Sequence, residues 1–113
     1  MRERLFTSAA PRFSSEVIEG LRAVGCHELA QELPSLGLGR WAHDAKTGAL
    51  SIQLLGPELN PFESAIVATG YGRSLPLRLQ GTVLVELDNF GRMYGLEIFD
   101  REDVLEELRA GAP

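Results

Sequence analysis

Apolar residues recur at helical spacing in the first third of the chain. Val17 and Leu21 lie about one helical turn apart, and Ser15 precedes them with a hydroxyl that can accept hydrogen bonds from free helix amides. Gly25 is a natural helix end, because glycine readily takes the left-handed conformation found there. We therefore predict a helix that Ser15 caps and Gly25 ends, and we expect residues 1–12 to be irregular.

A second, shorter helical pattern follows in CHELAQELP, where Leu29 and Leu33 share one face. Pro34 ends this pattern, because proline disfavours helical geometry at the residue before it. Two short helices joined near Gly25 predict a helical hairpin over residues 13–34.

From Gly39 the pattern changes to alternation, which is typical of strands. In ALSIQLL, Leu50, Ile52 and Leu54 point to one side and the polar residues between them to the other, as in a strand with one buried face. The segment GRWAH precedes it, and the connection between the two ends in Gly48, which suits a hairpin. We expect Trp41, within GRWAH, to contribute to the core.

The middle of the chain is less regular. GPELNP, residues 56–61, is rich in glycine and proline and predicts a loop. We predict strands in ESAIVATGYG and in RSLPLRL. Pro76 then belongs on an edge strand or at a bulge, because proline cannot donate a hydrogen bond to a strand ladder.

The stretch VELDNFGRMYGLEIFD predicts a second hairpin, in which two alternating apolar runs flank DNFG, residues 88–91. A two-residue turn at the centre of DNFG places Val85 opposite Tyr94 and Val83 opposite Leu96. The predicted buried side carries Val83, Val85, Tyr94, Leu96 and Ile98.

The acids of this hairpin divide by role. Asp88 suits the start of the turn and Gly91 its close at positive φ. A calcium loop would need several more oxygen ligands and a distal acid. Glu86 and Glu97, on the polar side of the hairpin, have no structural role that the pattern explains.

A last helix is predicted in REDVLEELRAG, where Val104 and Leu108 recur at helical spacing. We expect Asp100 to cap this helix, with Asp103 three residues later in an arrangement like a capping box. The helix then covers residues 100–110. Together these elements predict one α+β domain, in which an antiparallel sheet of about four to six strands over residues 39–99 packs against the helical hairpin and the C-terminal helix.

Composition narrows the function. Of the 113 residues, 44% are hydrophobic and 24% charged, which is ordinary for a globular protein. The formal net charge of −5 argues against nucleic-acid binding, which normally needs a basic patch. The chain has no apolar run long enough for a membrane span and no convincing secretory signal, and its single cysteine makes no internal disulfide. We therefore expect a cytoplasmic protein that does not bind membranes.

No catalytic constellation is recognisable. His43 beside Asp44 could orient an imidazole, but no nucleophile accompanies the pair. Cys26 and His27 are adjacent in sequence, whereas working Cys–His pairs meet in space. GYGR, residues 70–73, lacks the lysine and spacing of a phosphate loop. We expect no enzyme activity, no metal and no cofactor.

The acidic end of the chain is the remaining candidate for a site. From Glu97 to Glu107 six acids oppose one base, Arg101. Such acids can be a solvated helix face that aids solubility, or they can meet a basic partner. The partner-binding candidates are Glu102, Asp103, Glu106 and Glu107 on the helix, with Asp88 and Phe90 at the hairpin tip.

Two segments carry a family resemblance. HDAKTGALSIQL and TVLVELDNFGRMYGLEIFD resemble a group of small bacterial domains of unknown function, whose last hairpin has an Asp-x-[Asp/Asn]-x-Gly turn and a Gly-[Ile/Leu]-Glu-[Ile/Leu] strand. The matching positions are Asp44, Leu50, Ile52, Val83, Val85, Asp88, Gly91, Gly95, Leu96, Glu97 and Ile98. The chain departs from the group by its N-terminal helices and by an insertion at residues 56–81.

The helical lead LRAVGCHELAQELPSL looks like the opening of longer relatives, some of which resemble immunity proteins of bacterial polymorphic and contact-dependent inhibition toxins. This resemblance implies a non-enzymatic cytoplasmic protein that binds a cognate toxin domain, expected to be a basic nuclease, as a monomer in a 1:1 complex. The alternative is a small regulatory or ligand-binding domain, which could be homodimeric. A pocket lined by Trp41, Tyr71 and Tyr94 would favour that alternative.

Overall fold

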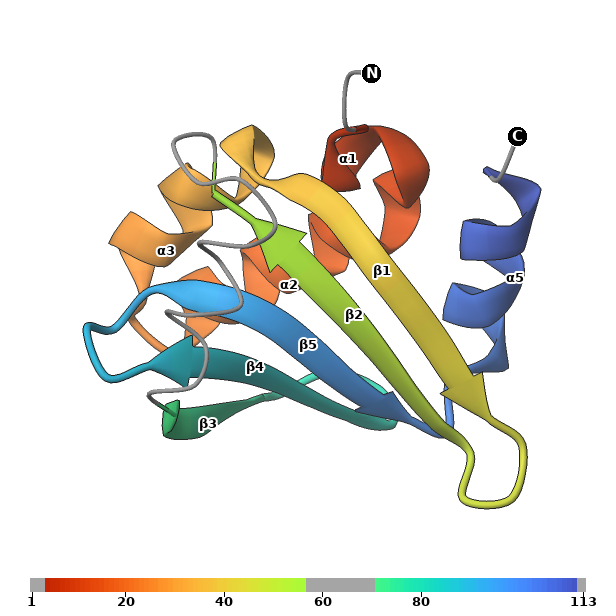
Figure 1. Cartoon of the computed structure of the whole chain (residues 1–113). Helices are drawn as coiled ribbons and strands as arrows, with labels where there is room; N and C mark the ends of the chain where they lie inside the picture. The colour runs from red at the N-terminus through yellow and green to blue at the C-terminus, as the bar shows by residue number, and fades with distance from the viewer. Residues whose placement is uncertain (1–3, 57–70, 112–113) are drawn as a thin grey trace.

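A computed structural model describes residues 4–56 and 71–111, and Figure 1 shows its arrangement. Residues 57–61 of the predicted loop at residues 56–61, and most of the predicted strand ESAIVATGYG, lie outside these described residues. The helices are α1 (Phe6–Ala9), α2 (Pro11–Ala23), α3 (His27–Glu32), the 3₁₀ helix η1 (Leu33–Ser35) and α5 (Glu102–Ala110). The strands are β1 (Gly37–Asp44), β2 (Ala49–Leu55), β3 (Tyr71–Leu77), β4 (Thr82–Asp88) and β5 (Met93–Phe99).

The five strands form one antiparallel sheet in the order β1-β2-β5-β4-β3. In Figure 1 the N-terminal helices lie behind this sheet, and α5 lies beside them near β1. The predicted α+β class is therefore confirmed, with helices before and after an antiparallel sheet. The predicted edge position of Pro76 is also confirmed, because β3 is an outer strand of the sheet.

The core lies between the sheet and the helices. Leu50, Ile52 and Leu54 of β2 are buried on the side that the alternation predicts, while Ser51 between them is exposed. From the helices, α2 contributes Val17 and other apolar residues to the same cluster, and α5 contributes its own apolar stripe. The buried apolar residues of α5 are Val104, Leu105 and Leu108.

The N-terminal region is helical where irregular structure was predicted. Residues 1–12 were expected to be irregular, but α1 begins at Phe6 and α2 begins at Pro11, so Ser15 lies inside the helix and caps nothing. Proline suits the first helical position, because that position needs no N–H donor. Phe6 packs edge to face against Phe13, with ring centroids 6.2 Å apart. The buried apolar residues of the N-terminal helices therefore begin at Phe6, earlier than the predicted helix, whose first apolar residue was Val17.

The end of α2 follows the prediction. Gly25 has φ +82° and its N–H donates to the Arg22 carbonyl. The N–H of Cys26 donates to the Leu21 carbonyl at 2.8 Å. These two hydrogen bonds form a Schellman motif, which satisfies the last carbonyls of the helix and turns the chain into α3.

The turn between β4 and β5 has three residues instead of the predicted two. The Asp88 N–H donates to the Arg92 carbonyl at 2.9 Å, and the Gly91 N–H donates to the Asp88 carbonyl at 3.0 Å. Asn89, Phe90 and Gly91 form the loop, and Gly91 closes it at φ +80°. A left-handed residue at the end of a three-residue loop is a common hairpin geometry.

A β-bulge in β5 adds a second shift. Leu87 pairs with Met93, whereas Glu86 pairs with Gly95, so Tyr94 is the extra residue on its strand. The bulge is adjacent to the loop, and each of the two features displaces the ladder by one residue.

The two shifts together make the predicted register wrong by two residues. Val85 faces Leu96 instead of Tyr94, and Val83 faces Ile98. Because side chains alternate with a period of two, this double shift keeps the faces of the strands. Val83, Val85, Leu96 and Ile98 are buried as predicted, but Tyr94 is only half-buried and does not belong to the core cluster.

The start of α5 also differs from the prediction. The N-cap residue is Arg101, and Asp100 is an exposed residue with φ +60° at the junction with β5. Asp100 therefore lies one position too early to cap the helix. The Asp103 carboxylate binds the guanidinium of Arg101, so it does not form the predicted capping box.

Candidate functional site

The face of the sheet opposite the core carries a shallow hollow of about 390 Å³. None of the described helices lies over this face in Figure 1. Four neighbouring strands contribute to the hollow. Its lining is Arg40, Trp41 and Ala42 from β1, Ser51, Ile52 and Gln53 from β2, Glu86 from β4, and Tyr94, Gly95, Leu96 and Glu97 from β5.

Gly95 is at the centre of the hollow. It pairs with Gln53 of β2 on one side and with Glu86 of β4 on the other. Because glycine has no side chain, a gap is left between the side chains of Gln53 and Glu86. A Cβ atom at Gly95 would lie 3.0 Å from the Ile52 carbonyl oxygen, closer than such contacts normally come. A glycine inside a strand marks a bulge or a close approach of backbone, and this glycine lies beside a bulge.

Two aromatic residues border the hollow, each at an irregularity of its strand. Tyr94 is the bulge residue of β5, and its displacement from the core places it in the lining. Trp41 follows a register shift in β1 between Leu38 and Trp41 and borders the hollow. It pairs with the buried Ile52, so its half-buried side chain lies on the core side and packs against the core. The expected contribution of Trp41 to the core is therefore confirmed.

Two carboxylates share this face. Glu86 accepts a hydrogen bond from the Ser74 hydroxyl at 2.6 Å, and both of its neighbours across the ladder are small or polar. Glu97 is two residues beyond Gly95 on β5, so it is a diagonal neighbour of Glu86. Within the described part of the chain, neither carboxylate forms an ion pair with Arg40 or any other base.

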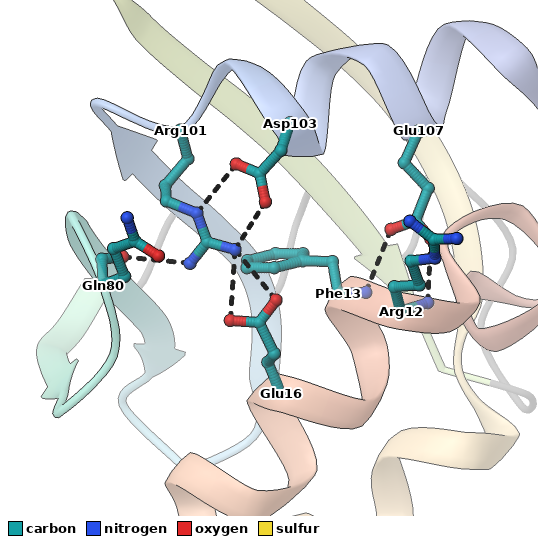
Figure 2. A network of polar contacts seen from close by, with 7 residues as sticks. All are labelled: Arg12, Phe13, Glu16, Gln80, Arg101, Asp103 and Glu107. Carbon is teal, nitrogen blue, oxygen red and sulfur yellow. Dashed lines mark hydrogen bonds and ion pairs between the residues drawn. The ribbon is translucent and has the colours of Figure 1, made fainter.

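The acids of α5, in contrast, divide into two pairs. Figure 2 shows that Asp103 and Glu107 are committed to contacts inside the protein. Asp103 accepts two hydrogen bonds of 2.9 Å from the Arg101 guanidinium. Glu102 and Glu106 are exposed, and neither forms an ion pair among the described residues.

Glu107 caps another helix. Its carboxylate accepts the backbone N–H of Arg12 at 2.8 Å and that of Phe13 at 2.9 Å, at the first turn of α2. These amides are among the free donors that every helix has at its N-terminus. Glu107 therefore caps the N-terminus of α2, a role that we had expected Ser15 to play at a helix start several residues later.

Arg101 ties three parts of the chain together. Its side chain is only 3% exposed and donates to the Gln80 carbonyl, to both oxygens of Glu16 and to Asp103 (Figure 2). The guanidinium also lies over the Phe13 ring, 5.5 Å from its centroid. Hydrogen bonding to Asp103 raises the pKa of Arg101, against an opposing effect of burial, and the same hydrogen bond lowers the pKa of Asp103.

The two partner-binding candidates at the hairpin tip differ in exposure, since Asp88 is buried and Phe90 is exposed. Asp88 is 2% exposed, and its carboxylate accepts the N–H groups of Phe90 and Arg92 and the Arg92 side chain. A buried carboxylate with these donors holds the turn and presents little to a partner. Phe90 is 72% exposed, with the Arg92 guanidinium 5.0 Å from its ring centroid.

His43 does not line a hollow together with its sequence neighbour Asp44. The Asp44 carboxylate accepts the backbone N–H of Lys46 in the β1–β2 turn. His43 lines a different hollow of about 320 Å³, with Asp100 and Glu102 but without Asp44. Among residues 4–56 and 71–111, no cluster of acids, histidines and cysteine could hold a metal ion.

Comparison of the chain with models of protein families, with curated proteins and with solved structures finds no match. None of the described helices is long and apolar enough to cross a membrane. Glu86 and Glu97 stand out in the sequence as acids without a structural role, whereas a shared site with Arg40, Gln53 and Gly95 was not predicted. The strand glycine at position 95 is the signal that could have indicated the hollow.

Proposed function

We propose that this protein is a non-enzymatic immunity protein, which binds and neutralises a cognate bacterial toxin domain in the cytoplasm as a monomer in a 1:1 complex. The expected target is a basic nuclease of the contact-dependent growth inhibition type. The observation that carries the proposal is the hollow on the sheet, which is lined by Tyr94 and by the acids Glu86 and Glu97 of two neighbouring strands. Buried aromatic anchors dominate the energy of many protein interfaces, and complementary charge steers the encounter.

The free acids of α5 support the same proposal. Glu102 and Glu106 are exposed, and the whole chain carries a net charge of −5, so a basic partner would be attracted over a distance. Asp103, Glu107 and Asp88 are engaged within the protein and take no direct part in the proposal. Phe90 remains a candidate apolar contact because of its exposure.

The test is binding to the toxin domain encoded by the adjacent upstream gene, followed by protection of cells that express this toxin. We expect a stable complex and full protection. A purified toxin domain that neither binds the protein nor is neutralised by it would contradict the proposal.

A double charge-reversal variant tests whether the acids of α5 attract the toxin domain electrostatically. Glu102→Lys with Glu106→Lys should slow association with the toxin and flatten its salt dependence. The matched control is Glu28→Lys with Glu32→Lys, which changes the net charge equally at two exposed positions on α3. Equal effects of both double variants would mean that only the total charge matters.

A second candidate, a small ligand-binding domain, is favoured by one observation. Trp41 and Tyr94, two of the three aromatic residues that would indicate a ligand pocket, line the same hollow. The third, Tyr71, has no described side chain. A small molecule that raises the melting temperature of the isolated protein, in the absence of any toxin that it binds, would favour this candidate.

A further inference from the structure

β1 is an outer strand of the sheet, and part of its outer edge is open (Figure 1). The start of this edge is covered, because Leu5 forms a bridge with Gly37 and the Leu38 N–H donates to a backbone carbonyl of the N-terminal segment. No other described segment pairs with the edge. Residues 40–44 therefore present backbone donors and acceptors to which a further strand can bind.

The β1–β2 hairpin determines which backbone groups of β1 face outward. The Asp44 carbonyl accepts the Gly48 N–H at 2.8 Å, so the backbone groups of Asp44 point toward β2. Because this direction alternates along a strand, the groups of Ala42 also point toward β2, whereas those of Trp41 and His43 point away from the sheet. Trp41 and His43 thus supply the free N–H and carbonyl groups of the open edge.

The side chains of the open edge carry opposite charges at its two ends. Arg40 and Asp44 are exposed, and Ala42 lies midway between them on the same face of the strand. Trp41 and His43 lie on the core side, since their partners on β2 are buried. Arg40 forms no ion pair within the described part of the chain. A strand of the same sequence running in the opposite direction would place an acid opposite each base.

We propose that the free protein forms a dimer in which the open edges of β1 from two copies pair antiparallel, with Ala42 on the two-fold axis. This axis places Arg40 opposite Asp44 of the second copy and Trp41 opposite its His43. Each contact occurs twice, because a two-fold interface uses the same surface of both copies. Opposite charges directly across two antiparallel strands are favourable, and the outward groups of Trp41 and His43 form the hydrogen-bonded pairs of the ladder.

The interface of this dimer is small. The register shift between Leu38 and Trp41 ends the regular part of β1, so the pairing extends only over residues 40–44. Each copy also carries a net charge of −5, which opposes association. We therefore expect a weak dimer with a Kd of about 100 µM. The inference goes beyond the proposed function, because it concerns the free protein, whereas the proposed toxin complex contains one copy of the chain.

Sedimentation equilibrium of the full chain between about 10 µM and about 1 mM measures the dimer. Arg40→Asp places a carboxylate opposite Asp44 at both contacts, and Asp44→Arg places a guanidinium opposite Arg40 at both. Each variant alone should dimerise at least about tenfold more weakly than the parent, because attraction is replaced by repulsion twice.

Mixing the two variants should restore the dimer. In a heterodimer of Arg40→Asp with Asp44→Arg, both contacts again join an acid to a base, so its Kd should lie within about threefold of the parent value. The matched control is Arg22→Asp on α2, which changes the net charge as Arg40→Asp does and should leave the Kd within about twofold of the parent value. Unchanged melting temperatures would show that each variant is folded.

Amide exchange in the parent protein tests the same contact without a substitution. The N–H groups of Trp41 and His43 face outward in the free strand and become hydrogen-bonded in the dimer. For a Kd of about 100 µM, their exchange should slow about fourfold between about 10 µM and about 1 mM protein. The Ala42 N–H, which points toward β2, should exchange at the same rate at both concentrations.

The outcomes separate the dimer from the proposed function. A parent protein that stays monomeric at about 1 mM leaves the open edge to a strand of another protein and overturns the dimer, even if the toxin domain binds. A mixture of the two variants that associates no better than either variant alone also overturns it. A dimer that mixing restores upholds the inference, even if the toxin domain fails to bind and the proposed function falls.

Discussion

At the scale of single residues, the buried side chain of Arg101 joins three segments of the chain. Its guanidinium contacts the loop after β3, helix α2 and the first turn of α5. Its burial means that its charge depends on Glu16 and Asp103, whereas those two acids are partly exposed and can be hydrated without it. Removing the base and removing the acids are therefore unequal changes.

We predict that Glu16→Gln with Asp103→Asn destabilises the protein more than Arg101→Met does. The double variant leaves a buried charge without its carboxylates, which costs about 3–5 kcal/mol. Arg101→Met loses hydrogen bonds but leaves no buried charge, so we expect about 2–3 kcal/mol. Urea denaturation gives both values, and the reverse order would contradict this account.

Arg22 provides the control for that experiment. It pairs with Glu19 on the surface of α2, and both side chains are largely exposed. Arg22→Met should therefore change the free energy of unfolding by less than about 0.5 kcal/mol. A large effect here would show that the denaturation experiment reports charge in general and not the buried contact.

The sequence shows where the charges are but not which of them are paired. Asp103 and Glu107 look like Glu102 and Glu106 in the sequence, since all four lie on one acidic helix. Their partners are Arg101, which is buried by tertiary packing, and two amides at residues 12 and 13. Only the folded chain distinguishes acids with a structural role from acids that are free to meet a partner.

At the scale of elements, the β4–β5 hairpin shows how two irregularities can compensate. The three-residue loop alone would place Glu97 on the buried side and Leu96 on the other. The bulge at Tyr94 shifts β5 by one more residue and returns Leu96 and Ile98 to the core. The hydrophobic pattern predicts the faces correctly because burial fixes them, whereas loop length and bulges decide the register.

We therefore predict that deletion of Tyr94 is tolerated. The deletion joins Met93 to Gly95, which pair with consecutive residues of β4, so the ladder becomes regular and its other pairs are retained. The free energy of unfolding should fall by no more than about 2 kcal/mol, within the range of ordinary single changes. Denaturation and amide exchange across β4 and β5 would measure this.

Deletion of Glu97 is the matched control. It also removes one residue from β5, but it moves Ile98 into the place of a residue that faces away from the core. A one-residue slip exchanges the two faces of a strand, so this variant should not fold. Similar stability for the two deletions would refute the compensation of loop and bulge.

The cap that Glu107 places on α2 is an element-level contact with its own test. Glu107→Ala leaves the N–H groups of Arg12 and Phe13 without their acceptor, and loss of a helix cap costs about 0.5–2 kcal/mol. Glu106→Ala, next to it, removes an exposed acid and should cost less than about 0.5 kcal/mol. Faster amide exchange at residues 12 and 13 in the first variant alone would confirm the cap.

At the scale of the whole molecule, the order and type of most elements could be predicted, because their apolar periods are regular. The helical hairpin, the β1–β2 pair and the last helix follow directly from such periods. The start of α2 could not be predicted in this way, because its cap lies on α5. The hollow was missed for a similar reason, since it needs the alignment of four strands that are not all consecutive in the chain.

The attachment of α5 to the rest of the molecule should weaken in acid. Arg101 lowers the pKa of Asp103, so the folded protein binds this proton less readily than the unfolded chain does. The contribution of the contact is complete above the unfolded pKa of about 3.9 and is lost as the pH falls through the lower folded value. The stability difference between the parent and Asp103→Asn should therefore shrink below about pH 4.

Denaturation at a series of pH values measures that difference. Glu102→Gln is the control, because Glu102 is exposed and forms no ion pair among the described residues. Its difference from the parent should stay small at every pH. A gap between the parent and Asp103→Asn that widens in acid would contradict the assignment of the contact.

The cap on α2 cannot form during synthesis until Glu107 has been added to the chain. Arg12 leaves the ribosome's catalytic centre 95 residues before Glu107 is added, an interval of about 5 to 20 seconds at ordinary rates of translation. Until then the first turn of α2 lacks the carboxylate that completes it. The nascent chain can form its helices and hairpins in order, but the N-terminal helix reaches its final state only when the last helix has been made.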